Sequence, residues 1–134
     1  MKKIRVTVIC IILVLVMGCF TGCSKYTSSW SASAFIHSNT PNNALMSFWK
    51  FSGTIVHTLV CKDSSKEVLN YSANLKKGKI TVYYDDDGTK KELFTIKEGE
   101  EITSEILKLH EGTVYVIVET DGECENGELE FNIK

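Results

Sequence analysis

The chain has 134 residues, 43% of them hydrophobic, which suffices for one domain of ordinary size and is too short for two. Its 15 Lys and Arg residues stand against 17 Asp and Glu residues, giving a net charge of −2, and Arg5 is the only arginine. Nucleic-acid binding needs a basic surface rich in arginine, so this composition argues against nucleic acid as a partner.

The first 24 residues read MKKIRVTVICIILVLVMGCFTGCS and have the pattern of an export signal. A basic start is followed by an apolar run that ends at Met17, and two Gly-Cys pairs close the segment. The run is shorter than the ~20 residues that a membrane-spanning helix needs. It therefore predicts a secretory signal, residues 1–22, rather than a transmembrane anchor.

A cysteine directly after a small residue resembles the lipobox of bacterial lipoproteins. The resemblance implies cleavage before that cysteine, acyl chains on it, and attachment to the extracytoplasmic face of the cell membrane. Cys19 has the branched aliphatic residue that the lipobox favours three positions earlier, whereas Cys23 has the favoured small neighbours. Lipidation at Cys23 leaves an even pair of thiols in the exported part, so we favour Cys23 and keep Cys19 as the alternative.

The next segment, residues 23–43, is rich in serine and asparagine and holds the only proline. This composition predicts a flexible tether that carries the lipidated cysteine at one end. Trp30, Phe35 and Ile36 are unusual in a tether, and docking on the membrane, docking on the domain and no role at all remain open for them.

From residue 44 to the end, apolar residues alternate with polar ones between regularly spaced turns, which is typical of antiparallel strands. An Asp86-Asp87-Gly88 sequence predicts a hairpin turn. One segment, 100–110, also fits a helix, but the regular turn spacing favours a strand. The seven expected strands cover residues 48–61, 67–75, 79–85, 93–96, 100–110, 113–119 and 127–133.

Seven antiparallel strands in about 90 residues predict an all-β sandwich domain over residues 44–134. From Tyr71 onward the pattern also resembles small uncharacterised surface lipoproteins of bacteria, which implies a jelly-roll-like sandwich and no activity. The residues that carry this resemblance are Gly78, Asp87, Gly88, Gly112, Tyr115, Ile117, Gly127 and Phe131.

No pattern in the chain predicts catalysis, a cofactor or a metal. His37, His57 and His110 are scattered, without the spacing of a metal site. The aspartates at 85–87 lack the spaced ligands of a calcium loop and fit a solvated turn better. The glutamates at 98–105 and 123–130 could pair for glycoside hydrolysis, but solvated strand edges explain them more simply.

Three aromatic residues, Trp49, Tyr83 and Tyr115, are the candidate ligand-binding residues, because an exposed aromatic can stack on a sugar ring or contact a protein. The leading prediction is a lipid-anchored, non-enzymatic surface domain for an envelope, glycan or protein ligand. The alternative is a small extracellular inhibitor or immunity-type protein. Cys61 and Cys124 are expected at opposite ends of the sandwich as free thiols, because five strands separate them.

Overall fold

The structure is a computed structural model that describes residues 25–106 and 108–134. Within them the fold is entirely β, so the predicted fold class is confirmed, and no helix there could span a membrane. The lipobox cysteines lie outside the described residues. The nine strands are β1 (Ser29–Ser33), β2 (Ile36–Thr40), β3 (Asn43–Cys61), β4 (Leu69–Lys77), β5 (Lys79–Asp85), β6 (Lys91–Lys97), β7 (Glu101–Ile106), β8 (Gly112–Thr120) and β9 (Cys124–Ile133).

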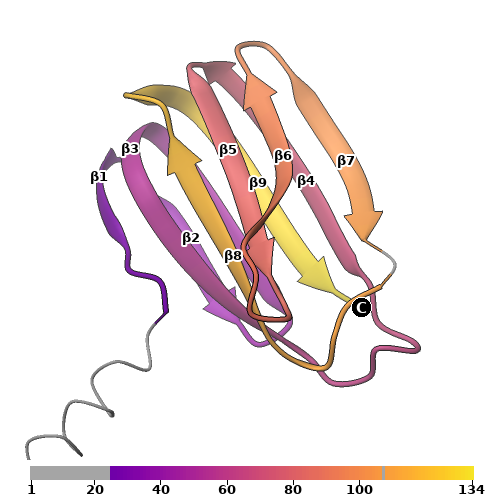
Figure 1. Ribbon diagram of the computed structural model, residues 1–134. Coiled ribbons are helices and arrows are strands. Elements are labelled where there is room, and N and C mark those ends of the chain that lie inside the picture. Colours follow the sequence, from indigo (N-terminus) through magenta and orange to yellow (C-terminus); the bar gives the residue numbers. More distant parts are fainter. Residues whose placement is uncertain (1–24, 107) are drawn as a thin grey trace, which may run out of the picture.

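The strands form one antiparallel sheet folded over on itself into two layers. β3 changes partner at its middle, because residues 43–51 pair with β9 and residues 54–61 pair with β8. β4 passes into β5, β6 into β7 and β8 into β9 at the same end of the molecule. The back layer is therefore β2, the first half of β3, β9, β4 and β7, and the front layer is the second half of β3, β8, β5 and β6 (Figure 1).

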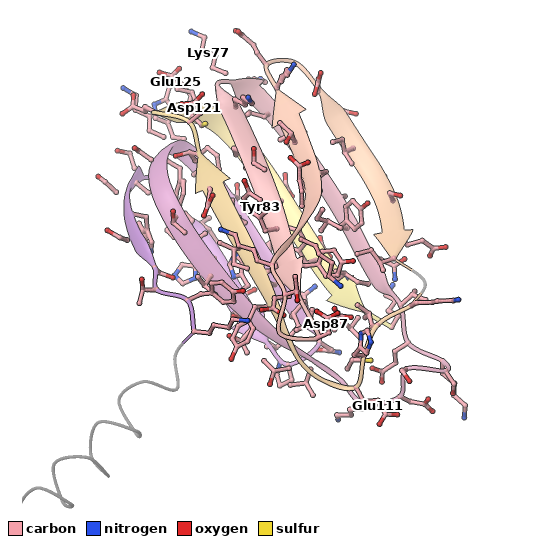
Figure 2. All side chains as sticks on the ribbon, in the orientation of Figure 1. Lys77, Tyr83, Asp87, Glu111, Asp121 and Glu125 are labelled. Atoms are coloured by element: carbon pink, nitrogen blue, oxygen red, sulfur yellow. The ribbon has the colours of Figure 1, made fainter. Side chains whose placement is uncertain are left out.

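Two glycines allow the sheet to fold over on itself at the end where β4 passes into β5 and β8 into β9. Gly53 has φ 119° and faces β1 so closely that an added Cβ would lie 2.3 Å from the Ser29 carbonyl oxygen. Gly78 has φ 103°, and its Cβ would lie 2.6 Å from the Sγ of Cys124. Both positions need a left-handed backbone and close approach, which only glycine combines without strain. In Figure 2, Lys77, Asp121 and Glu125 mark this end, and Asp87 and Glu111 mark the opposite end.

The core lies between the layers and consists of the inward residues of each strand. Phe131 of the back layer is 6.4 Å from the Phe94 ring of the front layer, and Tyr71 is stacked 5.2 Å from Phe94. Phe51, Met46, Leu59, Leu69 and Leu129 are fully buried beside them. The apolar alternation that predicted the strands is thus the alternation between this core and solvent.

The predicted tether is wrong for residues 29–40, which form β1 and β2. Both strands pair with β3 in one register, from Ser29 opposite Thr54 to Thr40 opposite Asn43. Trp30 packs 6.0 Å from the core ring of Phe51, which secures the segment to the domain. The seven expected strands correspond to β3–β9, and segment 100–110 contains the strand β7 as predicted.

The N-terminal segment also closes the free edge of the front layer. The backbone N–H groups of Val56 and Val60 donate to Ser28 Oγ at 2.9 Å and to the Pro41 carbonyl at 2.7 Å. Between them, the Asn39 amide exchanges two hydrogen bonds of 2.8 Å with the backbone of Thr58. The edge of β3 is therefore covered rather than open to another strand.

The segment begins with a clasp, formed by Lys25 and Tyr26 on the buried carboxylate of Asp85. Lys25 Nζ and the Tyr26 hydroxyl donate to Asp85 Oδ2 at 2.8 Å and 2.6 Å, and Lys25 also donates to the Gly88 carbonyl. Burial alone would raise the pKa of Asp85, but these hydrogen bonds and one from the Gly88 N–H lower it to about 2. The clasp therefore fixes the chain to the domain from residue 25 onward.

The two cysteines of the domain, Cys61 and Cys124, are buried free thiols at opposite ends of the sandwich. Cys124 pairs with Phe51 beside the bend, the point at Gly53 where β3 passes from one layer to the other. Cys61 pairs with Gly112 at the opposite end. Burial, the largest cause in each, raises the pKa of both thiols and keeps them protonated.

Candidate functional site

The outer face of the back layer is the candidate site, and we call it the polar face. Along β3 the even residues Ala44, Met46 and Phe48 are buried, so the odd residues point outward. β9 and β4 alternate in the same way. The outward residues are Asn43, Leu45, Ser47 and Trp49 of β3, Glu128, Glu130 and Asn132 of β9, and Asn70, Ser72, Asn74 and Lys76 of β4.

Strand register arranges these residues in straight rows across the layer. One row runs Ser47, Glu128, Asn74, Glu101, and the next runs Leu45, Glu130, Ser72, Thr103. A third row runs Asn43, Asn132, Asn70, Glu105. Neighbours within a row are about 4.8 Å apart and successive rows about 6.7 Å apart, because paired strands and alternate residues have these spacings. Apart from Leu45, the three rows therefore form a regular lattice of hydrogen-bonding side chains.

Three shallow hollows lie in series on this lattice. We name them lower, middle and upper in the order in which they follow β4 from Asn70 to Lys76. The lower hollow, about 160 Å³, lies around Asn70, Ser72, Thr103 and Asn132. The middle hollow, about 180 Å³, shares Ser72 and Thr103 with it.

The upper hollow, about 190 Å³, shares Asn74 and Glu128 with the middle one and reaches Ser47 and Asn126. Because neighbouring hollows share walls, they form one continuous groove along β4 and β9. From Asn70 to Lys76 the groove is about 20 Å long.

The upper end of the polar face carries its exposed apolar side chains. Trp49 continues the outward alternation of β3 beyond Ser47, and its side chain is 52% exposed. Ile36 of β2 pairs with Ser47, which places it on the same face one row from Trp49, and it is 69% exposed. A large aromatic ring that is half exposed beside a polar groove can stack on a ring of a ligand.

Acidic groups outnumber basic ones on the polar face. Glu130 accepts hydrogen bonds from the amides of Asn132 at 2.9 Å and Asn43 at 3.4 Å, which orient its carboxylate. Among the described residues, the carboxylates of Glu101 and Glu128 have no hydrogen-bond or ion-pair partner and are free to accept from a ligand. The groove thus offers amide and hydroxyl donors together with carboxylate acceptors, and it disfavours anions.

The structure does not bring the three predicted ligand-binding aromatics together. Trp49 belongs to the polar face, whereas Tyr83 and Tyr115 lie on β5 and β8 of the front layer. Lys90 covers the Tyr83 ring at 4.2 Å, and Tyr26 packs edge-on against Tyr115 at 5.3 Å. Figure 2 labels Tyr83 on the face turned toward the viewer. The two tyrosines already have contacts within the domain, and Trp49 is the most open of the three.

A second polar cluster, at the far end from the bend, is explained by the structure of its loop. Asp86, Asp87 and His110 come within 4.8 Å of one another, a spacing that a metal ion could use. Lys91 Nζ, however, lies 3.3 Å from both carboxylates, and the His110 N–H donates to Asp86 at 2.9 Å. These contacts already compensate the negative charge. The predicted turn is present, but it is not solvated as expected: Asp85 and Asp86 are buried, and of the three aspartates Asp87 alone is exposed.

The asparagines of the polar face are the residues that sequence reasoning missed. Asn70, Asn74 and Asn132 are outward residues of expected strands, and solvent exposure alone explains a polar residue there. Asparagine is nevertheless depleted in strands, so several outward asparagines are a signal of a functional face. Only the register shows that Asn132 and Asn70, distant in the sequence, are neighbours.

No protein-family model and no curated protein matches this sequence. Among solved structures, a family 61 carbohydrate-binding module in complex with β-1,4-galactotriose is similar, with 19% identity, 83% of this chain and 85% of that chain covered, and a TM-score of 0.46. A family 29 carbohydrate-binding module in complex with mannohexaose has 14% identity, covers 82% and 79%, and has a TM-score of 0.39. The Drosophila melanogaster CENP-C cupin domain has 15% identity, covers 78% and 75%, and has a TM-score of 0.33.

These similarities are distant, so any ligand of this protein has to be inferred from its own residues.

Proposed function

We propose that this protein is a non-enzymatic carbohydrate-binding domain, and that the polar face is its binding surface. The observation that carries the proposal is the continuous groove of asparagine, serine, threonine and glutamate side chains, together with the half-exposed Trp49, which follows the lining residue Phe48 at the upper end of the groove. A sugar chain presents hydroxyls that both donate and accept hydrogen bonds, and its ring faces are apolar. The groove supplies a partner for each property.

A protein partner fits this surface less well. The core of a protein interface is apolar and aromatic, with few charged residues. On the polar face the large apolar side chains are Leu45, Trp49 and Ile36, all near β3, while the groove floor between β4 and β9 is polar. The composition of the face therefore favours a hydrated, hydroxyl-rich ligand.

Replacing Trp49 is expected to weaken glycan binding most. The substitution Trp49→Ala removes the ring that stacks on the sugar, and loss of such a contact costs about 2 kcal/mol, or about thirtyfold in affinity. Affinity electrophoresis in gels that contain soluble polysaccharides, followed by calorimetry on the glycans that retard the protein, measures the effect.

Tyr83→Ala is the matched control, because it removes an aromatic from the opposite layer. Binding that is lost in Tyr83→Ala and kept in Trp49→Ala would place the site on the front layer instead. Hydrolysis of a bound oligosaccharide, abolished by Glu128→Gln, would contradict the non-enzymatic part of the proposal.

We also propose that a lipid on Cys23 anchors the domain to the extracytoplasmic face of the membrane, as the Gly22-Cys23 pair predicts. Mass spectrometry of protein extracted from membranes is expected to show an amino terminus at Cys23 that carries acyl chains. The variant Cys23→Ser should be unlipidated. A lipidated Cys23→Ser protein would instead assign the modification to Cys19.

A further inference from the structure

We infer that the groove binds an internal stretch of a linear, uncharged glycan rather than its terminus. The glycan runs parallel to β4 and β9, and at least three of its sugars contact the groove at once. This inference rests on the proposed carbohydrate binding and specifies the class of glycan. It follows from the order of the hollows, from the position of the apolar side chains and from the charge of the face.

The order of the hollows sets the direction of the chain. The lower hollow is built around Asn70, the middle one around Asn74, and the upper one between Asn74 and Lys76, so the series advances along β4. A ligand that crossed the strands would meet only one row of the lattice. A ligand that follows the strands meets all three hollows in turn.

The ends of the groove indicate that it takes the interior of a chain. A site for a chain terminus is a pocket with a closed wall, whereas these hollows are shallow depressions joined through shared side chains. Within residues 25–106 and 108–134, Trp49, at the upper end, is the one large exposed aromatic on this face. It therefore holds one sugar ring by stacking, while the other sugars are held by hydrogen bonds alone.

The charge of the face sets the class of sugar. Glu101, Glu128 and Glu130 line the hollows, and Glu105 is paired with Asn70 at the lower end. Lys76 is the one basic residue among the outward residues of β3, β9 and β4. A uronic acid chain would bring carboxylates against these carboxylates. Neutral sugars instead donate their hydroxyls to them, and such hydrogen bonds to a charged acceptor are the stronger kind.

The experiment measures the affinity of the purified protein for cello-, manno- and N-acetylchito-oligosaccharides of one to six units. For the series that binds, affinity is expected to rise at least a hundredfold from the monosaccharide to the trisaccharide or tetrasaccharide and to change less than threefold beyond it. The corresponding polysaccharide, whose chain ends are scarce, is expected to bind as tightly per site as the hexasaccharide. An oligouronate series is expected to bind at least tenfold more weakly at low salt.

Two asparagine variants test the direction. Asn70→Ala, at the end far from Trp49, is expected to weaken the hexasaccharide about fivefold and leave the disaccharide unchanged. Asn74→Ala, in the wall that the middle and upper hollows share, is expected to weaken both ligands. Neither amide has a hydrogen-bond partner among the described residues, so the fold should tolerate both substitutions.

Equal affinity for monosaccharide and hexasaccharide, or an Asn70→Ala variant that behaves like the parent with every ligand, would overturn the inference and leave carbohydrate binding intact. Binding of chain ends but not of the polysaccharide would overturn it as well. Failure of every glycan to bind would overturn the proposed function and the inference together.

Discussion

A chain that begins at Asn43 is expected to be at least about 3 kcal/mol less stable than one that begins at Lys25. The deletion removes β1 and β2 from the edge of β3, and it exposes Phe51 by taking away Trp30 and Phe35. Fully burying one aromatic side chain contributes about 2 kcal/mol, so the half-buried Trp30 and Phe35 together contribute about that much. The lost strand pairing of β1 and β2 with β3 adds to it. Urea unfolding of the two chains, monitored by tryptophan fluorescence and circular dichroism, gives the difference.

The clasp can be separated from the strands in the same experiment. Tyr26→Phe removes the hydroxyl that donates to Asp85 and keeps the ring on Tyr115, so it should cost about 1 kcal/mol. Equal unfolding midpoints for the chains that begin at Lys25 and Asn43 would contradict the assignment of residues 29–40 to the folded domain.

The stability of the fold is expected to fall by about 3 kcal/mol between pH 6.5 and pH 4 because of His57. The His57 side chain is buried between the layers, and its Nε2 has no hydrogen-bond partner. Burial, with a smaller contribution from the nearby His37, lowers the pKa of His57 from 6.5 to about 4. Between pH 6.5 and pH 4 the unfolded chain therefore binds a proton at His57 and the folded chain does not. The contribution of neutral His57 to the free energy of unfolding is fully present above pH 6.5 and is lost as the pH falls toward 4.

His57→Leu removes this titration and is expected to give a flatter curve of unfolding free energy between pH 7 and pH 4. Asp85, whose pKa is lowered to about 2, loses its stabilising contribution only below its ordinary value of 3.8, so the two effects occupy separate pH ranges. His37→Gln serves as the control for the exposed imidazole nearby. A parent protein and a His57→Leu variant with parallel curves would contradict the prediction.

The alternation of apolar residues was sufficient to predict β3–β6, β8 and β9, because each of these strands buries one side against the opposite layer. β7 was predicted from the regular spacing of turns, since its apolar residues also fit a helix. Reasoning from alternation failed for β1 and β2. They are edge strands that bury little, so serines and asparagines dominate their sequences and give the composition of a linker. Trp30 and Phe35 were the residues that pointed to docking, and the structure shows that both pack on Phe51.

The candidate site was predictable only in part. Trp49 could be selected as an exposed aromatic, but Tyr83 and Tyr115 could not be separated from it without knowing which strands form which layer. The alternation of apolar and polar residues predicts that Asn74 and Glu128 both point outward, but it does not predict that they are neighbours. That fact depends on the pairing of β4 with β9, whose sequences lie about 50 residues apart, and pairing of distant strands leaves no local signal.

If Cys23 carries the proposed lipid, the clasp of Lys25 and Tyr26 limits where the proposed ligand could lie. A free tether of about 20 residues would hold the domain roughly 25 Å above the bilayer and let it sweep a wide volume. With residue 25 fixed on Asp85, a lipid on Cys23 has only one residue before the folded domain, a span of at most about 7 Å. The sandwich would then stand directly on the lipid headgroups, on the end that carries Asp87. A domain held this close to the membrane could hardly move away from it. It would contact only glycans that lie in the innermost layer of the envelope, next to the lipid headgroups.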